Sequence, residues 1–154
     1  YWTLSATGEK TINKVGLEGP LMEASRFLSQ ATLGADLATI EQVANQGIEA
    51  WIDDQMTVPQ SQTLDRLNEV FAEVIEWYLV NGGNPDEVST RPYWTIFNYT
   101  WWENHMKNDD LLRQKVALAL SEIFVISIES NLSDAGFGLA DYYDVLLKLS
   151  LIHI

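Results

Sequence analysis

Residues 110–127 read DLLRQKVALALSEIFVIS, and this stretch decides the fold. Between Val116 and Ile126 apolar side chains fall on every side of a helix, a pattern typical of a helix surrounded by others. Asp109 and Asp110 precede the run, at the end where the helix dipole favours carboxylates. Glu122 interrupts the run, which is also shorter than the roughly 20 residues of a membrane span. We therefore predict a buried central helix near 110–127.

Helical periodicity continues before and after this stretch. Pro20 suits a first helical position, and Gly34 ends the first run of apolar residues at three and four spacing. Asp36 and Gly47 are typical caps for the start and end of a second helix. No alternating strand pattern competes with these signals. Further helices are expected over 48–56, over 61–80, from Pro92 onward and from about Ser133 onward. The predicted fold class is all-α, an irregular multi-helix domain.

The first part of the chain lacks this periodicity. Residues 1–19 mix Gly, Lys, Glu, Thr and Asn in no regular order, so we expect a linker or disordered arm with little regular structure. The helical domain would then occupy residues 20–148. The segment NGGNPDEVSTRP, residues 81–92, is dense in turn-forming residues and predicts the longest loop.

Composition excludes several classes of function. The chain of 154 residues is 47% hydrophobic, as expected for one domain with a real core. Its formal net charge is -13, and only nine residues are Lys or Arg, so it cannot neutralise many phosphates and nucleic acid is not an expected partner. An anionic membrane surface would repel it for the same reason. With no cysteine, disulfides and thiolate metal sites are excluded.

No motif in the sequence specifies a catalytic centre. His105 lies in ENHMKNDD near Glu103 and Asp109, but a metal site needs several ligands at a recognisable spacing. A Ser-His-Asp arrangement and a G-x-S-x-G elbow are also missing from the sequence. We predict no catalytic residues, no metal and no cofactor. His105 is a candidate binding residue, although a histidine near a helix C-terminus is also favoured by the dipole alone.

Aromatic and acidic stripes offer two further candidate surfaces. Trp101 and Trp102 could contribute to a stacking or partner-binding platform, because aromatic rings supply large rigid contact areas. The opposing interpretation is core packing, which we predict for Trp94 and Trp101 from their shared helical face. The acidic stripe could bind cations but is more typical of a solvated helix face. It comprises Asp65, Glu69, Glu73 and Glu76.

Two arginines complete the candidate binding residues. Arg113 precedes the apolar section, where it could bind an anion or form a partly buried ion pair with Asp109 one turn earlier. The same two alternatives, an anion site or a partly buried ion pair, apply to Arg26. Ser121 and Ser127 are expected to donate hydrogen bonds to carbonyls one turn earlier, which allows a hydroxyl inside a buried helix.

Four segments together resemble a known bacterial family, the domain of unknown function 1800. They are RFLSQATLG at 26–34, GIEAWIDDQM at 47–56, the stretch at 110–127 and YYDVL at 142–146. In the third segment Asp110, Arg113 and Gln114 fit the family pattern, whereas the sequence departs from it at Leu111, Lys115, Leu118 and Glu122. The resemblance spans Arg26 to about Leu147, and it implies a longer protein of which this chain is the N-terminal portion.

The resemblance also bears on the last residues, LSLIHI at 149–154. The family pattern continues differently after YYDVL, and these residues resemble one translated frame of a sequencing-adapter end. We therefore expect residues 149–154 to be adapter read-through, the alternative being a native helix or strand end. A truncated domain should leave an exposed apolar patch beside Leu139 to Leu147.

Two functions follow from the resemblance as expectations. The first is a binding or assembly module of an exported bacterial protein, located outside the cytoplasm. Its expected partner is a sulfatase-like or phosphatase-like protein of the family of unknown function 1501, because genes of the two families often neighbour one another. The second is a hydrolase-type enzyme whose catalytic residues lie mainly in the C-terminal part of the longer protein.

Overall fold

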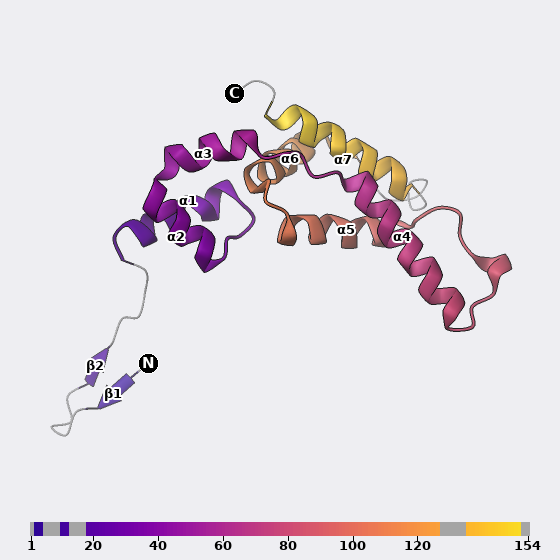
Figure 1. Cartoon of the computed structure of the whole chain (residues 1–154), viewed down its shortest axis with the longest axis horizontal. Helices are drawn as coiled ribbons and strands as arrows, with labels where there is room; N and C mark the ends of the chain where they lie inside the picture. Colours follow the sequence, from indigo (N-terminus) through magenta and orange to yellow (C-terminus); the bar gives the residue numbers. More distant parts are fainter. Residues whose placement is uncertain (1, 5–9, 13–17, 127–134, 152–154) are drawn as a thin grey trace.

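The computed structural model describes residues 2–4, 10–12, 18–126 and 135–151, with side chains from residue 18 onward. Within these ranges the chain folds almost entirely into α-helices, as the periodicity predicts (Figure 1). The helices are α1 Pro20–Ala31, α2 Leu37–Gln46, α3 Ile48–Thr57, α4 Thr63–Val80, α5 Trp94–Lys107, α6 Leu111–Ile123 and α7 Gly136–Ser150, with a 3-10 turn η1 at Pro85–Glu87. The all-α fold class is therefore confirmed.

The first residues contain more regular structure than the sequence predicts. Strand β1, Trp2–Leu4, pairs antiparallel with β2, Lys10–Ile12, and Thr3 lies opposite Thr11. Each strand has only three residues, which is too short for a pattern of alternating polarity to be recognised. Residues 1–19 are thus not uniformly irregular.

Local signals position the first three helices as expected. Pro20 is the first residue of α1, where its missing N–H would have had no helical partner. The Asp36 carboxylate accepts a hydrogen bond from Thr39 N at 2.8 Å and caps α2. Gly47, at a φ of 92°, separates α2 from α3 in a conformation that side chains disfavour. These boundaries follow directly from residue type.

The described helices share two apolar cores. In the first, formed by α1, α2 and α3, Leu28, Val43 and Trp51 are buried. Phe27 packs edge-on against Trp51, with ring centroids 5.5 Å apart. Leu111 at the start of α6 also packs against this cluster. The first three helices are therefore joined to the rest of the domain through the N-terminal end of α6.

The second core lies between α5, α6 and α7. Its buried members are Ala117, Tyr143, Leu146 and Leu147, and partly buried Phe97 and Trp101 pack against them. Helix α4 lies against α5 and α7 and buries Leu67 and Val70. Figure 1 shows α4 extending beyond α5 and α7, so that its C-terminal end projects from the bundle.

The predicted central helix is shorter and less enclosed than its apolar sequence implies. Helix α6 ends at Ile123, and of its residues only Gln114 and Ala117 are buried. Phe124 and Val125 are 58% and 75% exposed. Apolar side chains around a whole helix favour burial, but they are buried only where other helices pack against them. Here α6 packs mainly against α7. Burial on all sides is thus wrong for the described part of the 110–127 stretch, and Ser127 lies outside the described residues.

Two further expectations concern the ends of α5 and α7. Helix α5 begins at Trp94 rather than at Pro92, whose carbonyl instead accepts a hydrogen bond from Gly136 N at 3.1 Å. Leu139 to Leu147 mostly face the core, but Val145 and Leu149 on α7 are exposed beside them.

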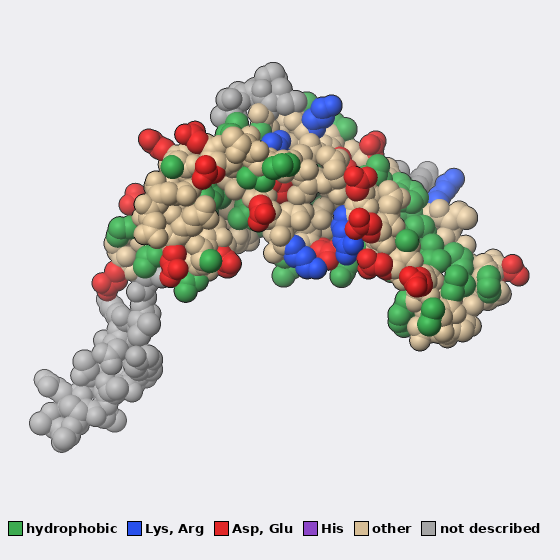
Figure 2. Space-filling view, viewed as in Figure 1, with side chains coloured by type: hydrophobic (Ala, Val, Ile, Leu, Met, Phe, Trp, Pro, Cys, Tyr) green, Lys and Arg blue, Asp and Glu red, His purple; other side chains and the backbone are tan. Residues whose placement is uncertain are grey.

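No described helix is long and apolar enough to cross a membrane. Figure 2 shows acidic side chains spread over the visible face.

Candidate functional site

Helix α5 brings three of the five predicted binding residues together. Trp101, Trp102 and His105 lie within little more than one turn, and the Trp101 ring stacks at a tilt on the His105 ring with centroids 3.7 Å apart. Arg113 lies on α6, which packs with α5 and α7 around the second core. Arg26 is exposed on α1, and its carbonyl accepts a hydrogen bond from the Ser29 hydroxyl. Arg26 is therefore no part of the α5 group.

Burial of His105 favours a neutral imidazole. Its Nδ1 lies 2.6 Å from the Trp101 carbonyl and donates to it, so Nε2 accepts from the Tyr143 hydroxyl at 3.2 Å. Burial lowers the pKa of His105, although the Trp101 carbonyl and the Asp110 charge act in the opposite direction. Burial also raises the pKa of Tyr143. The ring is at the end of α5, as predicted, but its role is that of a neutral core group and not of a cation at a helix dipole.

Asp110 is a buried carboxylate that fixes the connection before α4. It accepts hydrogen bonds from Ser61 N at 2.9 Å and from the Ser61 hydroxyl at 2.7 Å. The Gln114 side chain lies one turn further along α6 and donates weakly to both Asp110 oxygens at 3.4 Å. A carboxylate with these partners is held in place and satisfied, which is typical of a structural polar group.

Arg113 does not form the predicted ion pair with Asp109. Among the described residues, Arg113 instead donates from Nη1 to the Leu147 carbonyl of α7 at 3.2 Å. Residues one turn apart on a helix can pair, but the guanidinium reaches a neighbouring helix more favourably when that helix offers a carbonyl near its end. Arg113 thus links α6 to the last turns of α7, and its Nε is buried with no described partner.

Sequence reasoning missed two polar side chains that cap helices distant in the chain. The Gln55 amide of α3 donates to the Asp109 carbonyl at 3.0 Å and accepts from Leu112 N at 3.1 Å, at the start of α6. Asp144 of α7 accepts from the backbone N–H groups of Thr63 at 2.7 Å and Leu64 at 2.9 Å, at the start of α4. The sequence contained one signal for these caps, because Gln55 and Asp144 are polar residues within the apolar stripes of α3 and α7.

The Trp101 and Trp102 side chains line a cleft of about 340 Å³ between α5, α6 and α7. Trp101 is partly buried and belongs to the core cluster, whereas Trp102 is 58% exposed. The predicted burial of Trp94 is wrong, since that side chain is 39% exposed. The other walls are formed by Phe97, Asn98, Leu118, Ser121, Val125, Ile126, Leu139, Tyr142 and Tyr143. We call this surface the aromatic cleft.

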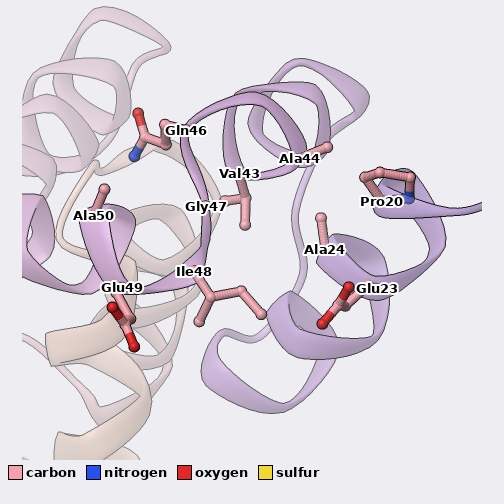
Figure 3. A pocket seen from close by; sticks show the side chains of 10 residues that line it. All are labelled: Pro20, Glu23, Ala24, Val43, Ala44, Gln46, Gly47, Ile48, Glu49 and Ala50. Carbon is pink, nitrogen blue, oxygen red and sulfur yellow. The ribbon is translucent and has the colours of Figure 1, made fainter.

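Two other hollows are less suited to specific recognition. One of about 360 Å³ is bordered by His105, Lys107 and Asp36, but both His105 nitrogens are already engaged. Another of about 440 Å³ lies between α1 and the junction of α2 and α3, where Ala24, Val43 and Ile48 face one another (Figure 3). Its polar lining residues, Glu23, Gln46 and Glu49, lie apart around the hollow and do not converge on one point.

Potential metal ligands and the Ser121 hydroxyl have no reactive arrangement among the described residues. Within ranges 18–126 and 135–151, no group of three or more His, Asp or Glu side chains could hold a metal ion. The Ser121 hydroxyl donates to the Leu118 carbonyl at 2.7 Å, as predicted, and is therefore not activated by a base. The acidic stripe of α4 is exposed but not wholly unpaired, because Arg66 contacts Glu69 and Glu73 there and Glu103 of α5.

The structural polar groups coincide with the sequence segments that suggested a family. Gln55, Asp110, Arg113 and Asp144 connect different parts of the helical domain, and Gln114 contacts Asp110 within α6. No curated protein and no solved structure matches the chain. A family model does match, over residues 26–151, and its description is a protein of unknown function, DUF1800. Because this match covers most of the chain and includes the segments that contribute these connections, the chain belongs to the DUF1800 family.

Proposed function

We propose that this chain is a helical binding or assembly module whose contact surface is the aromatic cleft. The observation that carries the proposal is the exposure of Trp102 beside a cleft whose walls come from three helices. Partly exposed tryptophan and tyrosine side chains combine large apolar area with few rotatable bonds, and they are enriched where protein interfaces derive their energy. The ligand class favoured by this surface is an apolar segment of another protein.

The disposition of the polar groups supports binding over catalysis. His105 is buried and engaged at both nitrogens, while Asp110 and Asp144 hold backbone and hydroxyl groups in place. A general base or nucleophile needs access to substrate, and these side chains are committed to the fold. We propose the protein of the neighbouring gene, sulfatase-like or phosphatase-like, as the partner, and an extracytoplasmic location for the complex.

A pull-down with that partner tests the proposal. The protein is tagged and compared with its Trp102→Ala variant, and Leu37→Ala on α2 serves as a control whose exposed side chain does not line the cleft. We expect Trp102→Ala to weaken binding by about thirtyfold or more, which corresponds to the roughly 2 kcal/mol lower limit for interface residues that dominate binding. Leu37→Ala should bind normally. Equal binding by all three proteins, or substrate turnover without any partner, would reject the proposal.

A further inference from the structure

The projecting end of α4 presents apolar side chains to solvent. Trp77 is 68% exposed and Val80 is 79% exposed, and Val74 is exposed one turn earlier. In Figure 2 hydrophobic side chains gather over this end of the molecule. Val74, Trp77 and Val80 do not line the aromatic cleft. Contiguous apolar surface of this kind is uncommon on soluble proteins unless another molecule covers it.

A groove runs beside this surface between α4 and α5. It consists of two adjoining hollows of about 230 and 270 Å³, which share Val74 and Ile96 as lining residues. Its remaining apolar walls come from α4, from the loop after η1 and from the start of α5. They are Val70, Phe71, Ile75, Trp77, Tyr78, Val88, Tyr93 and Tyr99. An extended apolar trough beside a helix fits the apolar face of a second helix.

Carboxylates border the groove. Glu73 lines one hollow and Glu87 lines the other. Between Thr63 and Tyr99 the chain carries six carboxylates and two arginines. Of these arginines, Arg66 already contacts Glu69, Glu73 and Glu103. The charge around the groove is therefore negative, which favours a cationic ligand and disfavours an acidic one.

We propose that the α4–α5 groove binds an amphipathic helix of a partner protein, with an apolar stripe flanked by Lys and Arg. The stripe would occupy the trough, while the cationic side chains would approach Glu73 and Glu87. A second copy of this chain is a poorer occupant, because two molecules of formal charge -13 repel each other and would bring matching acidic rims together. The inference is independent of the aromatic cleft, which uses other residues.

A labelled peptide tests the predicted chemistry. The probe is a fluorescein-labelled helix of about 18 residues, or five turns, with leucines on one face and lysines on the other. A scrambled peptide of the same composition removes the apolar face, and a leucine–glutamate analogue reverses the charge. Fluorescence anisotropy is measured with the whole chain, with Val74→Asp and Trp77→Ala in the groove, and with Glu87→Lys on its rim. Leu37→Ala is the control variant, and Trp102→Ala tests whether the peptide binds in the aromatic cleft instead.

The expected result separates the two surfaces. The leucine–lysine helix should bind at least about tenfold more tightly than either control peptide, and Val74→Asp and Trp77→Ala should each weaken it about tenfold. Glu87→Lys should weaken it and reduce its dependence on salt. Leu37→Ala should leave binding unchanged. Loss of binding in Trp102→Ala would place the peptide in the aromatic cleft and overturn the proposal. Equal binding of the scrambled peptide, or no effect of Val74→Asp, would overturn the proposal. A wild-type dimer that Val74→Asp dissociates would identify a second copy as the occupant and overturn it as well.

Discussion

Asp144 provides the sharpest test of how the helices are held together. Its carboxylate lies on α7 but accepts the N–H groups of Thr63 and Leu64 at the start of α4, so Asp144→Ala would leave two partly buried donors without their acceptor. A hydrogen bond to a charged group contributes about 1.5 to 3 kcal/mol. Burial raises the pKa of Asp144, although the N–H groups of Thr63 and Leu64 act in the opposite direction, so desolvation of the carboxylate opposes this gain. We therefore expect Asp144→Ala to lower the free energy of unfolding by about 2 to 4 kcal/mol.

Asp36 supplies a matched comparison. It caps α2 from the adjacent position in sequence and is solvent-exposed. Asp36→Ala should therefore lower the free energy of unfolding by only about 1 kcal/mol. Urea unfolding followed by circular dichroism gives both values, and amide exchange at Leu64 reports on the start of α4 directly. Exchange there should accelerate in Asp144→Ala and not in Asp36→Ala. If Asp144→Ala costs no more than Asp36→Ala and leaves exchange at Leu64 unchanged, the proposed connection between α7 and α4 is not stabilising.

Two further predictions concern charge and core packing. Hydrogen bonds from Arg66 and Lys107 lower the pKa of Glu103 from 4.5 to about 2, so its stabilising contribution is complete above pH 4.5 and is lost as the pH falls toward 2. The difference in urea midpoint between wild type and Glu103→Gln should therefore shrink over that interval, and a constant difference would contradict this role. Trp51 is 2% exposed, so Trp51→Ala should cost about 3 to 5 kcal/mol. In thermal melts of both variants, Trp94→Ala should lower the free energy of unfolding clearly less than Trp51→Ala. Equal losses would contradict the difference in burial between the two side chains.

The sequence predicted helices most accurately where a boundary depends on neighbouring residues. Pro20, Asp36 and Gly47 each restrict the backbone or satisfy a helix end locally, and all three occur at the predicted boundaries. The prediction that a helix begins at Pro92 was wrong, because proline is compatible with the first position of a helix but does not require a helix to begin there. Its carbonyl is instead bonded to Gly136, a contact that depends on a segment far along the chain.

Burial and side-chain partners were much less predictable. An apolar residue on a helix can be covered only if another helix lies over it, which explains why Ala117 is buried while Phe124 is exposed. Arg113 had a plausible local partner in Asp109 but bonds to the Leu147 carbonyl of α7. The pairing of His105 with Tyr143 likewise joins residues from two helices. Spacing within one helix contains no information on which distant helix will be adjacent.

The sequence by itself determined the all-α class, the positions of most helices, the acidic character and the family, because each depends on composition, on local backbone preferences or on residue order. Only the tertiary structure decided which polar residues are structural and which aromatic residues face solvent. Gln55, Asp110 and Asp144 find their hydrogen-bond partners across long separations in sequence, and Trp102 is exposed because no described helix covers it. Packing between helices sets these outcomes, because the hydrophobic effect favours burial without specifying the partner.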